Sequence, residues 1–355
     1  MSDADIALSL QAEVQAAIAE KIPLSIRGGG SKAFYGRTSQ GKCLVVAPHC
    51  GIIDYEPSEL VITARAGTPL KTLNAELAAQ GQHLAFEPPH FGSTATLGGT
   101  IACGFSGSSR PYLGAARDFV LGVKCITGKG EMLHFGGQVM KNVAGYDVSR
   151  LMVGALGSLG VLLEISCRVL PMPVQQVSLR LPVDNEAQAL QQLTHWNTQC
   201  LPLTASCFDG EAVWLRLAGV EISQARQKVP AELVSQETAS AFWENLREQQ
   251  LGFFTSAQTP LWRLSVPPTA PSLNLGKSII EWGGGLRWVY SDLPAEQIRA
   301  AVEKIGGHAT LFRGGDRTAE VFHPLPPVLR KLHERLRQQF DPDNILNPSH
   351  FSTHW

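Results

Sequence analysis

Three glycine-rich segments, far apart in the sequence, constrain the fold of this chain more than any other feature. The first is Arg27-Gly28-Gly29-Gly30-Ser31-Lys32, the second spans residues 88–104, and the third spans residues 141–161. Glycine inside a helix costs about 1 kcal/mol relative to alanine, so such segments indicate places where the backbone must approach another group closely. The pattern predicts binding surfaces made largely of backbone atoms.

The first segment follows a predicted strand over residues 23–26 and is typical of an anion-binding turn. Its glycines let successive N–H groups converge, and Arg27 and Lys32 add positive charge. Taken alone, the segment fits an ordinary glycine-rich turn equally well. A Rossmann fingerprint would need glycine at position 33, where alanine stands, and the Walker-like triplet at 276–278 lacks its earlier glycine. Both nucleotide motifs are therefore excluded.

The other two segments differ in the chemistry they offer. The second predicts a buried loop whose hydroxyl and N–H groups suit an extended polar ligand, with apolar contact from Leu97 and Ile101. A mobile surface loop is the alternative, and the mixture of small and apolar residues disfavours it. In the third segment, glycine recurs every third residue from Gly154 to Gly160, a spacing that is unfavourable in a helix.

Hydrophobic periodicity predicts an α+β chain in two parts. An amphipathic helix is expected over residues 3–20, a helix capped by Thr68 from residue 70 onward, and a hairpin over 119–135. Pro171 and Pro173 mark the boundary, after which a helix capped by Asp184 is expected and further helices alternate with hairpin strands. A basic amphipathic helix is expected over 327–340.

Composition excludes several classes of protein. With 44% hydrophobic residues the chain can bury a core, and a net charge of −1 gives no electrostatic footprint for nucleic acid. The seven cysteines contain no C-x-x-C pair, which indicates reduced thiols in the cytoplasm. The uncharged stretch 151–163 is shorter than the ~20 residues that a membrane-spanning helix needs.

Together the three segments resemble the FAD-binding domain of the vanillyl-alcohol oxidase/PCMH superfamily. The resemblance covers about residues 1–172 and the tail Phe340-Asp341-Pro342-Asp343-Asn344-Ile345-Leu346-Asn347-Pro348. Further runs, among them Glu87-Pro88-Pro89-His90 and Gly306-Gly307-His308-Ala309-Thr310, are similar to the FAD-binding E subunits of bacterial glycolate oxidases. That second resemblance spans essentially the whole chain.

The resemblance implies a fold class and three domains. The expected fold is α+β, with a PCMH-type two-subdomain FAD-binding domain at 1–172 and an α+β cap domain with an antiparallel sheet at 173–312. Residues 313–355 are expected to form a C-terminal helix and tail that return to the FAD domain.

It also implies FAD as the cofactor. In the family, the first glycine loop cradles the FAD pyrophosphate and the other two segments line the rest of the cofactor. The cofactor-binding residues expected here are Arg27, Gly28, Gly29, Gly30, Ser31, Lys32, Pro89, Thr96, Leu97, Gly98, Gly99, Ala102, Gly104, Gly154, Gly157, Leu159, Gly160, Val161 and Asn347. Because the first loop has no histidine or cysteine, non-covalent FAD is expected.

A substrate site is harder to find in the sequence. The metal-binding histidine pair and the E-H-G-I-G segment of the catalytic branch are both missing, so no metal site is expected, and His308 alone does not make one. His90 is the candidate for catalysis. Candidate carboxylate anchors are Arg110, Arg117 and Arg313, although most arginines serve as surface ion-pair residues.

The functional expectation is a subunit of a complex that oxidises glycolate to glyoxylate. The expected partners are a larger flavin subunit, which carries out the oxidation, and an iron–sulfur subunit, while this chain relays electrons or supports assembly. The expected location is cytoplasmic, with any membrane association made peripherally through the complex. Two alternatives stay open: a stand-alone FAD-dependent 2-hydroxyacid or alcohol dehydrogenase, and a non-catalytic scaffold subunit.

Overall fold

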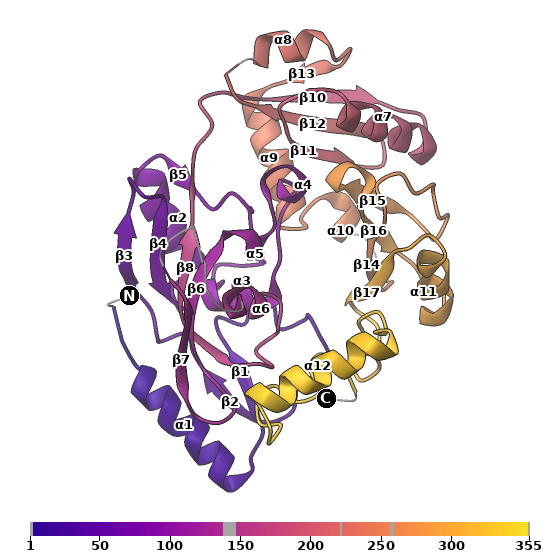
Figure 1. Cartoon of the computed structure of the whole chain (residues 1–355). Helices are drawn as coiled ribbons and strands as arrows, with labels where there is room; N and C mark the ends of the chain where they lie inside the picture. The colour runs from indigo at the N-terminus through magenta and orange to yellow at the C-terminus, as the bar shows by residue number, and fades with distance from the viewer. Residues whose placement is uncertain (1–2, 138–146, 221, 256–258, 354–355) are drawn as a thin grey trace. The chain divides into compact units, whose positions relative to one another are not determined.

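The computed structural model describes residues 3–137, 147–220, 222–255 and 259–353 (Figure 1). The chain divides into two compact units. The first comprises Met1–Phe105, Ala115–Pro171 and Arg317–Trp355, and the second comprises Ser106–Gly114 and Met172–Asp316. The short segment Ser106–Gly114 thus packs with the second unit, although the predicted domain 1–172 includes it.

The first unit is built on a five-stranded antiparallel sheet in the order β3-β4-β8-β6-β7. Two smaller sheets accompany it, the parallel pair β1-β2 and the antiparallel pair β5-β9. The strands are β1 (Leu24–Arg27), β2 (Lys42–Val45), β3 (Ile52–Glu56), β4 (Val61–Arg65), β5 (Gln82–His83), β6 (Val120–Ile126), β7 (Met132–Gly136), β8 (Val161–Arg168) and β9 (Leu170–Pro171). The helices are α1 (Ala7–Glu20), α2 (Leu70–Ala79), α3 (Leu97–Cys103), α5 (Ala116–Phe119), α6 (Val148–Leu151) and α12 (Pro327–Phe340).

The second unit is an eight-stranded antiparallel sheet in the order β13-β10-β12-β11-β15-β16-β14-β17. Its strands are β10 (Gln176–Pro182), β11 (Leu203–Phe208), β12 (Ala212–Ala218), β13 (Glu232–Val234), β14 (Leu261–Ser265), β15 (Ser278–Glu281), β16 (Leu286–Tyr290) and β17 (His308–Arg313). The helices are α4 (Arg110–Leu113), α7 (Glu186–Thr198), α8 (Ile222–Gln227), α9 (Gln236–Arg247), α10 (Gly252–Thr255), the 3-10 turn η1 (Trp282–Gly284) and α11 (Ala295–Glu303). Among the helices described in either unit, none is long and apolar enough to cross a membrane.

The predicted hydrophobic periodicity is confirmed in helices α1 and α2. Leu10 and Val14 of α1 are buried, as are Leu70, Leu73 and Leu77 of α2, so each helix turns its apolar stripe into the core of the first unit. Strands β6 and β7 form the predicted antiparallel hairpin. The expected α+β fold with an antiparallel sheet after residue 172 is also confirmed.

Three local predictions are wrong, each for a hydrogen-bonding reason. Thr68 does not cap α2, because its hydroxyl exchanges hydrogen bonds with the backbone of Gly51. The second glycine-rich segment is not a loop throughout, since Leu97–Cys103 is helical with Thr96 as its N-cap. The helix expected to be capped by Asp184 is capped by Asn185, whose side chain accepts from the N–H of Gln188 at 3.0 Å.

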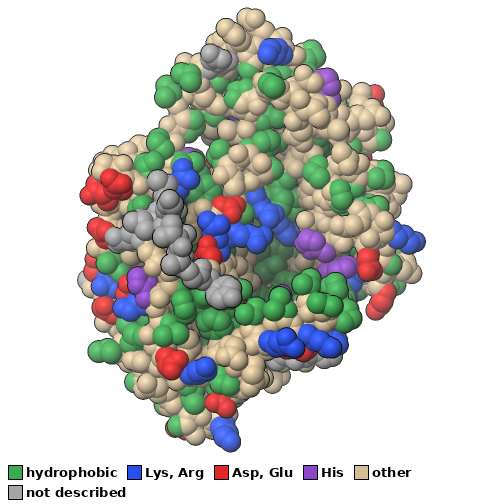
Figure 2. Space-filling model, viewed as in Figure 1, with side chains coloured by type: hydrophobic (Ala, Val, Ile, Leu, Met, Phe, Trp, Pro, Cys, Tyr) green, Lys and Arg blue, Asp and Glu red, His purple; other side chains and the backbone are tan. Residues whose placement is uncertain are grey.

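The C-terminal tail is fastened to the first unit through α12. Asp341 is buried and accepts from the N–H groups of Ile345 and Leu346, both at 2.9 Å, and Arg337 lies 3.5 Å from its carboxylate. Burial raises the pKa of Asp341. At the N-terminal end of α12, Val328 is exposed, and Lys and Arg side chains lie along the helix (Figures 1 and 2). The aspartate of the F-D-P motif therefore closes the last turn before the tail.

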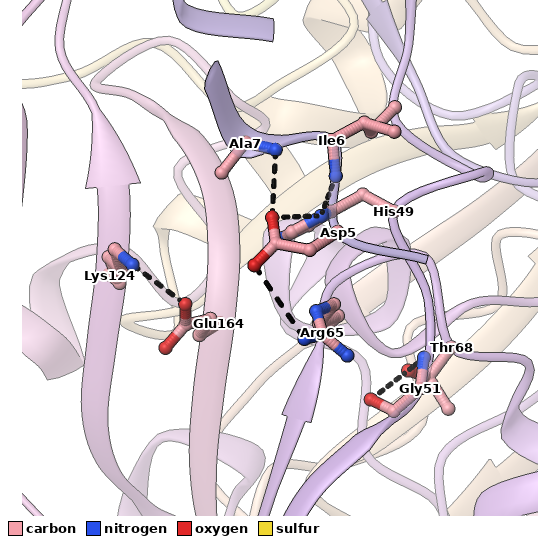
Figure 3. Close-up of polar contacts among 9 residues, drawn as sticks. All are labelled: Asp5, Ile6, Ala7, His49, Gly51, Arg65, Thr68, Lys124 and Glu164. Carbon is pink, nitrogen blue, oxygen red and sulfur yellow. Dashed lines mark hydrogen bonds and ion pairs between the residues drawn. The ribbon is translucent and has the colours of Figure 1, made fainter. Parts of the chain in front are cut away.

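A buried histidine fixes the start of α1 (Figure 3). His49 is fully buried and its Nδ1 accepts a hydrogen bond from the N–H of Ile6 at 3.2 Å. Asp5 lies 3.6 Å from the same nitrogen and pairs with Arg65 at 3.6 Å. Burial lowers the pKa of His49, against an opposing effect of the Asp5 charge. Nδ1 can accept from Ile6 only while the ring is neutral.

We predict that acidification loosens α1 through His49. Because the folded-state pKa of His49 lies below its unfolded value of 6.5, the stabilisation is present above pH ~6.5 and is lost as the pH falls through the folded pKa. His49→Asn keeps an acceptor for the Ile6 N–H without a titrating group. Hydrogen exchange of residues 7–20 should accelerate less between pH 7 and pH 5 in this variant than in the wild type. The exposed His134→Asn variant serves as control, and equal acceleration in all three proteins would contradict the assignment.

Candidate cofactor site

The first glycine loop presents a run of unbonded N–H groups. It begins where β1 ends at Arg27, and the chain turns at Gly30 with φ +76°. Within the described ranges, the N–H groups of residues 28–31 form no hydrogen bond to protein. Successive free N–H groups around a left-handed residue form a concave site for an anion.

A buried cation lies directly after these N–H groups. Lys32 is 8% exposed, and its Nζ donates to the carbonyl oxygen of His90 at 3.2 Å and to Ser31 Oγ at 3.4 Å. His90 in turn shares a hydrogen bond between its Nε2 and Asn74 Nδ2 at 3.2 Å. The lysine therefore joins the first loop to the start of the second segment and brings positive charge to the N–H run. Asn74, on α2, is a site residue that no sequence motif indicated.

The first and second segments touch backbone to backbone. A Cβ added to Gly29 would lie 1.5 Å from the carbonyl oxygen of Thr94, and one added to Gly28 would lie 2.5 Å from Thr96 Oγ1. Both distances are far below any van der Waals contact, so only glycine fits at these positions. Thr94 was not expected to take part, since its role depends on a loop more than sixty positions earlier in the chain.

The second segment is anchored to the sheet through α3. Thr96 Oγ1 accepts from the N–H of Gly99 at 3.3 Å, and the N–H of Gly98 donates to the carbonyl oxygen of Ala66 at 2.7 Å. A Cβ on Gly98 would lie 2.6 Å from the Cβ of Ala66. Leu97 is 1% exposed and packs in the core. This packing sets the direction of α3.

The third segment lies against the second. The N–H of Gly154 donates to the carbonyl oxygen of Ile101 at 3.0 Å, and the N–H of Leu156 donates to that of Ala102 at 2.9 Å. A Cβ on Gly104 would lie 3.0 Å from the Cα of Gly154. Residues 141–146 of this segment lie outside the described residues.

Asn347 ties the tail to the same region. Its Oδ1 accepts from the N–H of Ile26 at 2.7 Å, and its Nδ2 donates to the carbonyl oxygen of Leu156 at 2.7 Å. A Cβ on Gly157 would lie 2.8 Å from Asn347 Nδ2. The side chain thus holds β1 and the third segment together, which gives it a positioning role in the structure.

The remaining predicted residues divide into interior and open positions. Pro89, Leu159, Gly160 and Val161 are buried, and Val161 pairs with Ile126 in the sheet. At Gly154 an added Cβ would meet no atom within 4 Å, and at Gly99 it would meet only Thr96 Oγ1, at 3.2 Å. Gly99 and Gly154, with Arg27 and the loop 28–31, are therefore the predicted positions where a ligand could approach the backbone.

The other candidate groups are distributed more widely. Burial raises the pKa of the Cys103 thiol to about 11, against an opposing effect of Lys32, so the thiol stays protonated at neutral pH. Arg117 is exposed in the first unit, whereas Arg110 and Arg313 belong to the second. Across the part of the chain that the structure describes, no three His, Cys, Asp or Glu side chains are grouped as metal ligands.

We predict that Gly29→Ala destabilises the first unit far more than Gly154→Ala. The new Cβ at residue 29 must displace the Thr94 carbonyl, and such overpacking costs at least ~3 kcal/mol. At residue 154 the space is open and only the left-handed backbone, φ +83°, is unfavourable, at about 1 kcal/mol. Differential scanning calorimetry of the two variants measures the difference. Equal midpoints would show that the Gly29–Thr94 contact does not exist in solution.

Comparisons with known proteins identify the family of the chain. Residues 7–136 match the family model of the FAD binding domain. The chain is 48% identical over 351 residues to the glycolate oxidase subunit GlcE of Escherichia coli, covering 98% of each protein. It is 28% identical over 177 residues to the glycolate oxidase subunit GlcD of Bacillus subtilis, covering 49% of this chain and 37% of that one.

A solved structure shows the same fold at lower sequence identity. Alkyldihydroxyacetonephosphate synthase superposes with a TM-score of 0.67 at 15% identity, covering 96% of this chain and 75% of that one. The long match to GlcE, together with the FAD binding domain, decides the family. The chain belongs to the FAD-binding family of the glycolate oxidase subunit GlcE.

Proposed function

We propose that this chain is the FAD-binding subunit of a complex that oxidises glycolate to glyoxylate, and that it holds FAD without a covalent bond. The observation that carries the proposal is the run of unbonded N–H groups at residues 28–31 beside the buried cation of Lys32. Such a site fits a pyrophosphate, which carries two negative charges and offers oxygen acceptors to backbone donors. The similarity to a protein named as a glycolate oxidase subunit supports the choice of substrate.

The same residues divide the work of holding the cofactor. In this proposal the N–H groups of residues 28–31 bind the pyrophosphate, and Lys32 and Arg27 balance its charge. Gly99 and Gly154 leave room for the rest of the cofactor to lie against the backbone, next to Ala102. Asn347, Gly98 and Gly104 keep the three segments in register. When bound, FAD supplies the capacity to accept two electrons from a donor.

Non-covalent binding of FAD is proposed because the chain offers few nucleophiles near the site that could form a bond to the flavin. The first loop contains no histidine or cysteine. Cys103 lies near Lys32 at the end of α3, yet burial raises its pKa to about 11, which leaves almost no thiolate at neutral pH. Attachment at this cysteine would need the thiolate form.

The proposed role within the complex is electron relay or assembly beside a larger catalytic flavin subunit and an iron–sulfur subunit. Converting glycolate to glyoxylate removes two electrons and two protons, which requires a base for the hydroxyl proton. His90 is the candidate for that base. Its ring Nε2 shares a hydrogen bond with Asn74, and its backbone carbonyl oxygen accepts a hydrogen bond from the Lys32 ammonium. These contacts make it a support for the loop, which favours oxidation on another subunit. We infer a cytoplasmic location, with any membrane association made through the complex.

The absorption spectrum of the purified chain tests this function. We expect a flavin spectrum, complete release of the flavin into the supernatant after acid precipitation, and no bleaching when glycolate is added. Flavin that stays with the precipitate would contradict non-covalent binding. Bleaching of the flavin by glycolate would support a stand-alone dehydrogenase. A chain that does not bind FAD would support a non-catalytic scaffold subunit.

Gly99→Ala tests the placement of the cofactor without disturbing the packed glycines. Alanine suits the helical backbone at this position, and the new Cβ has only Thr96 Oγ1 close to it. If FAD lies against Gly99, its affinity should fall at least tenfold, measured by equilibrium dialysis, with the unfolding temperature of the apoprotein unchanged. Gly252→Ala in the second unit, where an added Cβ meets no atom within 4 Å, is the matched control. Unchanged FAD affinity in Gly99→Ala would remove α3 from the cofactor site.

A further inference from the structure

The Lys32 ammonium lies in a place that is electrostatically unfavourable for a cation. The side chain is 8% exposed and follows directly after the unbonded N–H groups of residues 28–31. These groups carry partial positive charge, so they favour an anion and disfavour an ammonium group. Removal from water also costs free energy unless other groups compensate the charge. Partners that offer partial negative charge are therefore needed to keep Lys32 at this position.

Two consecutive residues of the second segment supply such partners. The carbonyl oxygen of His90 accepts a hydrogen bond from Lys32 Nζ at 3.2 Å. The same nitrogen lies over the ring of Phe91, 5.9 Å from the ring centroid. A carbonyl oxygen and the face of an aromatic ring both attract a cation. Residues 90 and 91 thus act on one ammonium group with a lone pair and a π face.

The backbone of Phe91 has an unusual conformation that brings these two groups together. Its φ is +52°, which is rare for a bulky residue. At an ordinary helical φ of about −65° the side chain points away from the preceding carbonyl carbon. At +52° the carbonyl carbon of His90 and the Phe91 side chain lie on the same side instead. Strain of this kind persists where the surroundings hold it, and it is concentrated at functional sites.

Contacts on both sides hold this strained pair of residues. The ring of Phe91 packs edge to face against Phe34, with the centroids 5.4 Å apart, and against Phe105, with the centroids 6.1 Å apart. The ring Nε2 of His90 shares a hydrogen bond with Asn74 Nδ2 of α2 at 3.2 Å. These contacts come from the first glycine loop, from the end of α3 and from α2. The conformation is therefore fixed by three separate parts of the first unit.

We propose that Phe91 is a positioning residue that holds the Lys32 ammonium beside the N–H groups of residues 28–31. The lysine is then in place to balance the charge of the FAD pyrophosphate. The identity of that ligand rests on the proposed function, whereas the placement of Lys32 by Phe91 does not. Because Phe91 acts through Lys32, its effect on cofactor binding should disappear when the ammonium group is removed.

A double-mutant cycle, measured as FAD affinity by equilibrium dialysis, tests this dependence. Phe91→Leu removes the π face and should weaken FAD binding about fivefold. In a Lys32→Met background the same substitution should change the affinity less than about twofold, since residues that act as a pair are not additive. Phe91→Tyr keeps the ring and should restore the wild-type affinity. Phe91→Met, which also lacks a π face, replaces Phe91→Leu if that variant does not fold.

Phe86→Leu is the matched control for lost packing. Phe86 is fully buried in the same unit and packs against Phe119, with the ring centroids 5.7 Å apart. Its replacement should lower the unfolding temperature and leave the FAD affinity unchanged. A fall in FAD affinity equal to that of Phe91→Leu would show that lost packing alone explains both variants, and would overturn the assignment.

Nuclear magnetic resonance of the apoprotein, labelled with ¹³C-lysine, tests the placement without FAD. The ring of Phe91 should shift the Cε proton signals of Lys32 upfield, and the shift should be lost in Phe91→Leu and kept in Phe91→Tyr. Lys32→Arg removes the signal and so assigns it. An unshifted signal in the wild type, or equal effects of Phe91→Leu with and without the Lys32 ammonium, would contradict this inference alone. An upfield signal in a chain that does not bind FAD would contradict the proposed function alone.

Discussion

The close approach of Gly29 to the carbonyl oxygen of Thr94 is the contact on which the rest of the first unit depends. It leaves no room for a side chain, and it brings the loop after β1 against the segment that leads into α3. Once these two segments are joined, the third segment follows through its hydrogen bonds to Ile101 and Ala102. Asn347 then fastens the tail to β1 and to the third segment. Backbone contacts and the side chain of Asn347 thus link four parts of the chain.

The glycines of this region serve two distinct purposes. At Gly28, Gly29 and Gly98 the protein itself occupies the space that a side chain would need. At Gly99 and Gly154 that space is largely open. A ligand that lies against the backbone requires the second kind, while the first kind keeps the backbone in place. Replacing Gly28, Gly29 or Gly98 would therefore lower the stability of the fold, and any loss of ligand binding would follow from that.

The sequence predicted the segments well and their internal contacts poorly. Residues 24–27, 70–79 and 161–168 could be assigned because their apolar spacing or β-branched content is strong. The helical state of Leu97–Cys103 was hidden by its glycines, because the capping bond from Thr96 and the core packing of Leu97 outweigh their low propensity. The clamp at Asn347 joins residues 321 positions apart, which no local pattern reveals. The segment Ser106–Gly114 carried no sign that it belongs to the second unit.

In the proposed function, three distant glycine-rich segments surround one molecule of FAD. Hydrogen exchange of the chain with and without FAD, resolved by mass spectrometry, tests it most directly. We expect residues 28–32, 96–104 and 154–161 to gain protection together, at the same FAD concentration, while α8 in the second unit stays unchanged. Protection of one segment without the others, or of none of them when FAD is bound, would contradict the account.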